Sequence, residues 1–272
     1  MTSVPENPAV LASCADGVLL LTLNRRERGN AWNGAMSRAY FGMLEDAARN
    51  PDVRVIVVTG AGRAFCTGGD GEKLAEAAAA GDTRSTAPLP YWTPLRIGKP
   101  IIGAINGACF GIGMQQALCC DLRFAAEDTK FATAYTRRGL VAEFGMSWLL
   151  PRLVGTGHAM DLLLSARLVR AGEALSMGLV NRIVPAESLL NEAMAYARQL
   201  ATQCSPRAMQ AVKRQVWHDL MSDFAGSYAR SETMLAEASA SDDFREGISS
   251  WQESRPPAFP PLVEELAFID SA

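Results

Sequence analysis

Short apolar runs rich in β-branched residues recur along the chain, and each of the two clearest leads into a glycine turn. These two runs are residues 53–59 (VRVIVVT) and residues 101–105 (IIGAI), and residues 122–126 form a third. Runs of this length and composition predict buried strands. Sequence of helical composition follows the glycine turns, at residues 71–80 and 114–120. Strands that alternate with helices predict a layered α/β fold.

A different pattern precedes the first of these runs. Residues 9–14 and 18–24 are mainly apolar and are separated by Ala15-Asp16-Gly17, which predicts a hairpin of two strands. Residues 34–49 carry apolar side chains at helical spacing and predict an amphipathic helix. A small polar stretch at residues 75–86 has the composition of a mobile segment.

The last quarter of the chain changes character. After about Ser205 the pattern is helical, with no strand candidate to the end. We therefore divide the chain into a mixed core, residues 1–204, and a helical C-terminal region, residues 205–272.

Composition excludes several kinds of partner. The chain has 272 residues, enough for one large domain or two modest ones. A formal net charge of −3 gives no reason to expect a nucleic acid or an anionic membrane as partner. No apolar run approaches the roughly 20 residues of a membrane span. The N-terminus lacks the basic and apolar segments of a secretory signal, so we expect a cytoplasmic protein.

Metal chemistry is not expected either. The six cysteines show no C-x-x-C spacing, and His158 and His218 are the two histidines of the chain. We therefore expect no metal site and reduced thiols.

The two glycine turns carry the candidate chemistry. A strand that passes through a glycine turn into a helix leaves backbone N–H groups without partners and aimed at one point. Two such turns can place two donors around one oxygen, which makes an oxyanion hole. A dinucleotide site fits poorly, because Gln116 stands where the Gly111-x-Gly113 pattern needs glycine or alanine, and Glu127 follows too soon. A serine hydrolase fits poorly as well, because residues 145–149 (GMSWL) lack the last glycine of G-x-S-x-G.

Three stretches together resemble the enoyl-CoA hydratase/isomerase family, also called the crotonase family. They are LTLNRRERGNAWN, AFCTGGD and NGACFGIGMQQALCCDLRFA, and the similarity extends from about residue 9 to about residue 259. The resemblance implies a crotonase-type ββα spiral core, with a helical C-terminal region that forms a homotrimer or a dimer of trimers. It also implies an acyl-CoA thioester substrate, of which coenzyme A is a part, and no separate cofactor.

The same motifs imply which residues form the site. The oxyanion donors correspond to the N–H groups of Gly69 and Ile112, which would hold the thioester oxygen. The other positions implied in substrate binding are Thr67, Asp70, Gly111, Gln115, Tyr135 and, for coenzyme A, Arg28, Arg63 and Phe259. A solvated turn is the alternative for Arg28 and Arg63. Phe259 matches a family position near the adenine of a neighbouring subunit.

The acids that the hydratases use are missing. At their two glutamate positions this chain has Gln115 and Tyr135, and neither side chain exchanges a proton readily near neutral pH. Glu143 lies among apolar neighbours, at a position where isomerase-like relatives and 4-chlorobenzoyl-CoA dehalogenases carry one acid. Apolar surroundings raise a carboxyl pKa and suit it to proton transfer. The alternative for Glu143 is a glutamate that stabilises the start of the next helix.

We therefore expect Δ3-to-Δ2 enoyl-CoA isomerisation in fatty acid metabolism, with Glu143 moving a proton from C2 to C4. The alternatives are an enoyl-CoA hydratase and an acyl-CoA-binding oligomer that has lost catalysis. A dehalogenase fits less well, because neither histidine lies where those enzymes have their base.

Overall fold

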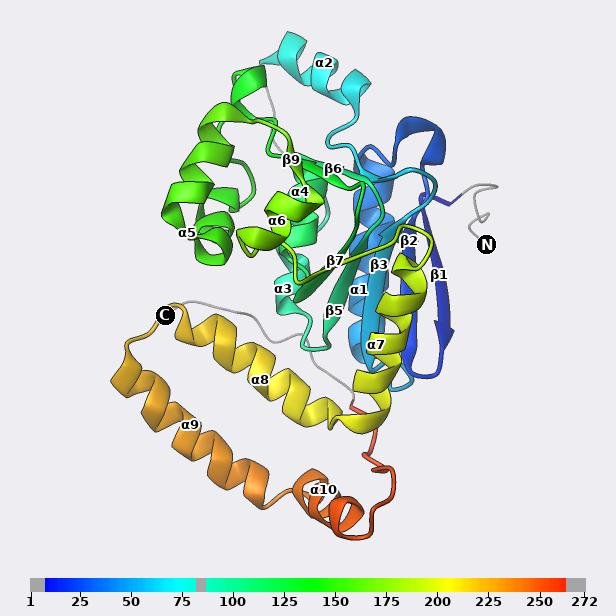
Figure 1. Ribbon diagram of the computed structural model, residues 1–272, viewed down its shortest axis with the longest axis vertical. Coiled ribbons are helices and arrows are strands. Elements are labelled where there is room, and N and C mark those ends of the chain that lie inside the picture. The colour runs from blue at the N-terminus through cyan, green and yellow to red at the C-terminus, as the bar shows by residue number, and fades with distance from the viewer. Residues whose placement is uncertain (1–7, 82–86, 263–272) are drawn as a thin grey trace.

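The computed structural model describes residues 8–81 and 87–262, and two sheets organise its first two thirds (Figure 1). The larger sheet has six strands in the order β1-β2-β3-β5-β7-β10. Its members are β1 (Val10–Ala15), β2 (Val18–Leu23), β3 (Val55–Gly60), β5 (Ile101–Ile105), β7 (Leu122–Ala126) and β10 (Arg182–Val184). The β1–β2 pair is the predicted antiparallel hairpin, and the other neighbours are parallel.

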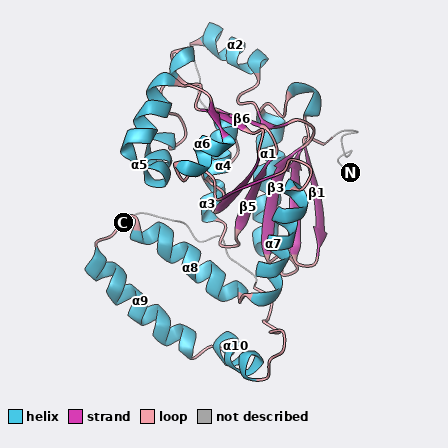
Figure 2. Ribbon diagram, viewed as in Figure 1, coloured by secondary structure: helices cyan, strands magenta, loops and turns pink. Residues whose placement is uncertain are grey.

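The apolar runs of the sequence form the centre of this sheet because both of its faces are covered. In β3, Val55 and Val57 pack in the cluster beneath α7 (Leu189–Gln203), whereas Ile56 and Val58 pack in the cluster that contains α1 (Gly34–Arg49). The alternation follows from the twofold period of a strand. Figure 2 shows the sheet between helices on its two sides.

The smaller sheet consists of short strands, of which the sequence pattern predicted the one that starts at Lys130 and did not reveal the other three. It has the order β4-β6-β8-β9, with β4 (Ala64–Cys66), β6 (Ala108–Phe110), β8 (Lys130–Ala132) and β9 (Val169–Arg170). Strand β3 leads into β4 and then α2 (Gly71–Ala80), and β5 leads into β6 and then α4 (Ile112–Leu118). Each unit is thus a long strand, a short strand and a helix, which is the ββα repeat expected from the resemblance.

Further helices surround this core. They are α3 (Thr93–Arg96), α5 (Met146–Ser165), which is interrupted at Gly155, and α6 (Ala171–Ser176), together with the 3-10 turns η1 (Arg26–Arg28) and η2 (Thr136–Arg138). Residues 75–80 of the segment expected to be mobile complete α2, and residues 82–86 lie outside the described residues. None of the helices in the described parts of the chain combines the length and hydropathy that a membrane span needs.

The C-terminal region is helical as expected. It contains α8 (Pro206–Asp219), α9 (Phe224–Ser239) and α10 (Asp242–Gln252). The described residues 206–262 contain no strand. Figure 1 shows α9 and α10 extending away from the two sheets. The division of the chain at residue 204 into two structural regions stays a prediction.

Candidate active site

A cavity of about 810 Å³ opens where the short strands end. Strands β4, β6 and β8 are parallel neighbours, so the segments that follow them leave the small sheet at the same edge. All three segments line the cavity, as Thr67 to Asp70 after β4, Gly111 and Ile112 after β6, and Thr133 to Tyr135 after β8. The fold therefore brings together residues that lie far apart in the sequence.

The N–H group of Gly69 points away from Trp32, the residue with which this segment pairs through its backbone. Trp32 N–H donates to Gly68 O at 2.7 Å, and Asp70 N–H donates to Trp32 O at 2.9 Å. In a trans peptide the C=O and the following N–H point in opposite directions. Since Gly68 O points at the Trp32 N–H, the Gly69 N–H points away from that group, and Gly69 itself lines the cavity.

The N–H group of Ile112 has no partner inside α4, for a similar geometric reason. Gly111 O accepts a hydrogen bond from Gln115 N–H at 3.0 Å and so points along α4. The Ile112 N–H, across the same peptide, points outward from the start of the helix. Gly111 is fixed by its own N–H, which donates to Ala132 O at 2.9 Å, and it adopts a φ of 49°.

The two donors are held close together by small residues. A Cβ on Gly111 would lie 3.8 Å from Gly68 Cα, so the two turns are in contact. A Cβ on Gly113 would lie 2.4 Å from Cys66 O, so glycine is what lets α4 approach β4 this closely. In the described chain neither Gly69 N–H nor Ile112 N–H donates to another group, as an oxyanion hole requires.

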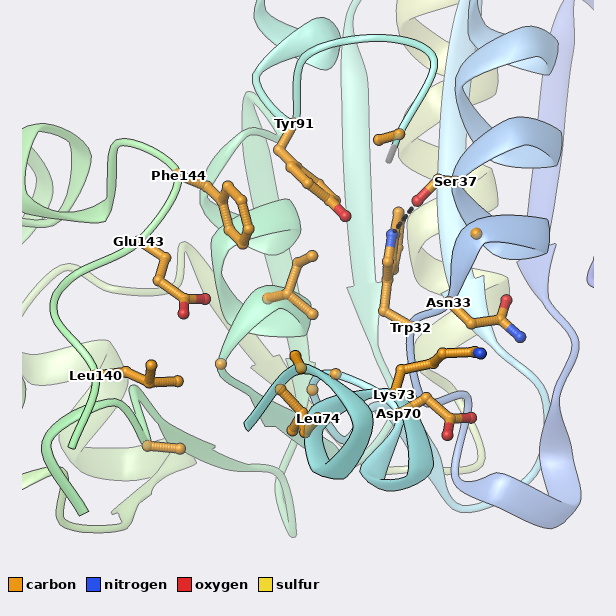
Figure 3. A pocket seen from close by; sticks show the side chains of 18 of the residues that line it. Trp32, Asn33, Ser37, Asp70, Lys73, Leu74, Tyr91, Leu140, Glu143 and Phe144 are labelled. Carbon is orange, nitrogen blue, oxygen red and sulfur yellow. Dashed lines mark hydrogen bonds between the residues drawn. The ribbon is translucent and has the colours of Figure 1, made fainter. Parts of the chain in front are cut away.

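Glu143 lies in the loop between η2 and α5 and lines the same cavity. Figure 3 shows its carboxylate pointing into the cavity from the side opposite Trp32. The side chain is partly buried, and this burial raises the pKa of the Glu143 carboxyl above its ordinary value. A carboxyl of this kind can accept and return a proton closer to neutral pH.

Two other carboxyl groups line the cavity among the described residues, and both are engaged. Asp70 accepts from the Arg25 guanidinium at 2.7 Å, which holds the pKa of that carboxyl below its usual range. Its other oxygen accepts from Glu72 N–H at 3.2 Å and so caps α2. Glu76 pairs with Lys73 at 2.7 Å. Glu143 is thus the carboxyl best suited to proton transfer here.

Tyr135 lines the cavity next to Glu143 but differs from it in chemistry. Its ring is buried, and within the described structure its hydroxyl has no hydrogen-bond partner. Burial, and secondarily the charge of Glu143, raise the pKa of the Tyr135 phenol well above its usual value. Tyr135 is therefore a neutral donor and not a base at neutral pH.

Gln115 is placed behind the cavity wall. It is fully buried on α4, and its amide nitrogen donates to Phe144 O at 3.2 Å. The wall in front of it is aromatic, with the rings of Tyr91 and Phe144 4.1 Å apart. Figure 3 shows these two rings on one side of Trp32. Neither Trp32 nor Phe144 was singled out from the sequence, although Phe144 directly follows Glu143.

The remaining predicted residues lie around the cavity or far from it. Thr67 lines it, and its hydroxyl donates to Gly29 O at 3.2 Å. Arg28 is exposed and pairs with Glu72 at 2.9 Å. Arg63 is exposed in the turn between β3 and β4. That turn packs on η1, because a Cβ on Gly62 would lie 2.9 Å from Arg26 Cγ.

Phe259 lies at the other end of the large sheet within this chain. Its carbonyl accepts from Arg54, the residue before β3, at 2.8 Å, and its side chain is buried. Its predicted place beside the adenine of a neighbouring subunit stays a prediction. Within residues 8–81 and 87–262, histidine, cysteine and acidic side chains form no group of three or more that could hold a metal ion.

Comparison with known proteins adds to this geometry. A family profile described as enoyl-CoA hydratase/isomerase matches residues 13–261. A probable enoyl-CoA hydratase of Rhodobacter capsulatus is 36% identical over 250 residues, which cover 90% of this chain and 95% of that protein. The 1,2-epoxyphenylacetyl-CoA isomerase of Escherichia coli is 33% identical over 269 residues, which cover 92% and 97%.

Solved structures agree with the sequence comparisons. The crystal structure of a probable enoyl-CoA hydratase/isomerase from Mycobacterium abscessus superimposes with a TM-score of 0.86 at 32% identity, covering 93% of this chain and 99% of that one. The 2,3-dehydroadipyl-CoA hydratase of Escherichia coli is also 33% identical, over 92% of this chain and 98% of its own length.

Proposed function

The chain belongs to the enoyl-CoA hydratase/isomerase family of enzymes, and from this premise we propose that it is a Δ3-to-Δ2 enoyl-CoA isomerase with Glu143 as its one proton-transfer group. The observation that carries the proposal is a single carboxyl with a raised pKa, facing two backbone donors across one cavity. Family membership supports an enzyme rather than an inactive acyl-CoA-binding oligomer.

The thioester carbonyl binds between the N–H groups of Gly69 and Ile112. Removal of a proton from C2 moves the electron pair onto the thioester oxygen and gives an enolate. The two N–H groups stabilise this negative charge, and losing one such donor typically costs about 10²–10³ in rate. These donors act through the backbone, so the side chain of Ile112 does not take part.

Glu143 carries out both proton transfers in this scheme. Its carboxylate takes the proton from C2 of the 3-enoyl thioester, and the negative charge spreads over the oxygen, C2 and C4. The same carboxyl then gives the proton to C4, the double bond moves from C3–C4 to C2–C3, and the carboxylate is restored. One acid on one face of the enolate is sufficient for the reaction.

Hydration is the competing activity, because some relatives are named hydratases. Hydration needs a water that is activated while a proton is delivered, and this chain has Gln115 and Tyr135 at the positions concerned. The Gln115 amide is buried and bonded to Phe144 O, and the Tyr135 phenol stays protonated. These observations favour isomerisation over hydration.

We also propose that the protein assembles as a trimer or a dimer of trimers, works in the cytoplasm and serves fatty acid metabolism. The first part has support in α8–α10 and their connections, which expose large apolar side chains at Val212, Val216, Leu220, Met221, Phe224, Tyr228, Leu235, Phe244, Ile248 and Trp251. Exposed apolar side chains that gather on one surface often mark a protein–protein contact. Sedimentation as a monomer at micromolar concentration would contradict the assembly.

The activity is tested by giving the purified protein 3-enoyl-CoA and 2-enoyl-CoA in separate incubations and identifying the products. The proposal predicts 2-enoyl-CoA from the first substrate and little 3-hydroxyacyl-CoA from the second. Efficient hydration of 2-enoyl-CoA, without isomerisation of 3-enoyl-CoA, would reject it.

A further inference from the structure

A pair of buried amides lies between the oxyanion helix and the loop that carries Glu143. Gln115 and Gln116 follow one another on α4 and are 0% and 2% exposed. Gln116 Nε2 donates to Gln115 Oε1 at 2.6 Å and to Tyr91 O at 2.7 Å. Gln115 Nε2 donates to Phe144 O at 3.2 Å. The amides thus connect α4 to both segments that supply the aromatic wall.

The backbone that Gln115 contacts is in an unusual conformation. Phe144 has a φ of 50° and Gly145 a φ of 78°, two consecutive residues in the left-handed region. A bulky residue pays a conformational cost there and stays only where its surroundings hold it. Here the surroundings are the Tyr91 ring, 4.1 Å from the Phe144 ring, and the amide on the Phe144 carbonyl.

This turn sets the direction of Glu143. Glu143 immediately precedes Phe144, and its own carbonyl accepts from Met146 N–H at 2.9 Å at the start of α5. The N-cap of α5 is Gly145, so no side chain caps the start of this helix at that position. The Gln115 amide donates to the Phe144 carbonyl, which lies between Glu143 and α5.

We propose that Gln115 is a positioning residue, whose amide holds the left-handed turn at Phe144 and so fixes Glu143 relative to the oxyanion hole. Ile112 and Gln115 belong to the same turn of α4, so one helix carries the donor for the enolate oxygen and the donor for the Glu143 loop. The role requires a hydrogen-bond donor at this position. A side chain without a polar hydrogen, such as methionine or leucine, could not donate to the Phe144 carbonyl. The proposal rests on Glu143 acting as the proton-transfer group.

Two variants test the amide itself. Gln115→Met keeps an unbranched side chain without a donor, and Gln115→Leu is a second apolar side chain without one. We expect each to lower kcat ten- to a hundredfold and to change KM by less than about threefold, since a displacement near 1 Å costs about 10² in rate. Leu118→Ala is the control, because Leu118 is buried on the same helix but does not line the cavity. It should lower the Tm and leave kcat within about twofold.

Hydrogen exchange of the amides in residues 140–146, measured without substrate, decides whether the turn is held. Faster exchange in both Gln115 variants, and not in Leu118→Ala, is the expected result. Unchanged exchange would overturn the proposal, and so would faster exchange with an unchanged kcat. A fall in kcat that the Leu118→Ala variant shares would show a structural role only and would also overturn it. Because exchange is read without turnover, it separates failure of this inference from failure of the proposed reaction.

Discussion

Adding one methyl group at Gly113 tests the oxyanion hole, whose donors belong to the backbone and cannot be removed by truncation. In Gly113→Ala the new Cβ would lie 2.4 Å from Cys66 O, 2.6 Å from Cys66 Cβ and 2.9 Å from Cys66 Sγ. Real Cβ contacts are not found below 3.0 Å, so α4 and β4 must separate by about 0.6 Å or more. The nearest atoms include backbone, which does not move aside as a flexible side chain does.

The displacement falls between the two proposed donors. Ile112 adjoins Gly113 at the start of α4, and Gly69 follows Cys66 by three residues. The two N–H groups should no longer reach one oxygen in their present geometry. Misplacement of this order, or loss of one donor, costs about 10²–10³ in rate. We therefore expect kcat/KM to fall about a hundredfold.

The assay is the turnover of whichever enoyl-CoA the wild type converts, followed by the absorbance of the conjugated thioester. Gly42→Ala is the matched control, because Gly42 lies inside α1 and a Cβ there meets no atom within 4 Å. It should keep wild-type activity and gain about 0.5–1 kcal/mol of stability. A Gly113→Ala variant that folds and keeps the wild-type kcat/KM would refute the assigned oxyanion hole.

Three further predictions follow from charges around the site. Arg25→Met leaves the buried Asp70 carboxylate without its cation and should cost about 1–3 kcal/mol of unfolding free energy, against less than about 1 kcal/mol for the exposed Arg28→Met. Because Arg25 lowers the pKa of Asp70, the stabilisation is present above the ordinary Asp pKa and is lost as pH falls through the lowered pKa of Asp70. The unfolding free energies of wild type and Arg25→Met should therefore converge in acid. A stability difference that persists in acid would contradict the role given to this ion pair. Arg63→Ala should weaken coenzyme A binding about two- to fivefold in low salt and less in high salt, as titration calorimetry can show, and equal affinity in low salt would remove Arg63 from the binding site. Burial raises the pKa of Glu143, so the acid limb of kcat/KM should lie above the ordinary Glu pKa of 4.5, with activity rising as the base form appears, and a limb at or below that value would exclude this carboxyl as the base.

The sequence was sufficient for the large sheet but, apart from the strand that starts at Lys130, insufficient for the small one. Residues 101–105 form β5 as predicted, and residues 53–59 correspond to β3 with a shift of one or two residues. Both runs are apolar on two faces, so their composition alone predicts buried strands. Strands β4 and β6 have three residues each and exist because they pair with one another across more than 40 residues of chain. The residues of a three-residue strand do not indicate which distant segment pairs with it, so a local sequence pattern cannot predict such a strand.

The same limit applies to the site. The pattern of strand, glycine turn and helix predicted backbone donors, the resemblance to the family assigned them to Gly69 and Ile112, and both residues line the cavity. Gln115 was expected to bind substrate, but its side-chain amide donates to Tyr91 O and Phe144 O, which contact α4 only in the folded chain. The aromatic wall likewise joins two segments more than 50 residues apart.

The most direct test of the account is Glu143→Gln, measured for both turnover and binding. The amide keeps the size of the side chain and removes the base, so 3-enoyl-CoA isomerisation should fall by at least about 10³-fold, within the range expected for a general base. Coenzyme A affinity should stay within about twofold. Glu127→Gln is the control, because Glu127 is an exposed glutamate in the turn after β7 and should keep the wild-type rate. Full isomerase activity in Glu143→Gln would show that Glu143 is structural and that another group moves the proton.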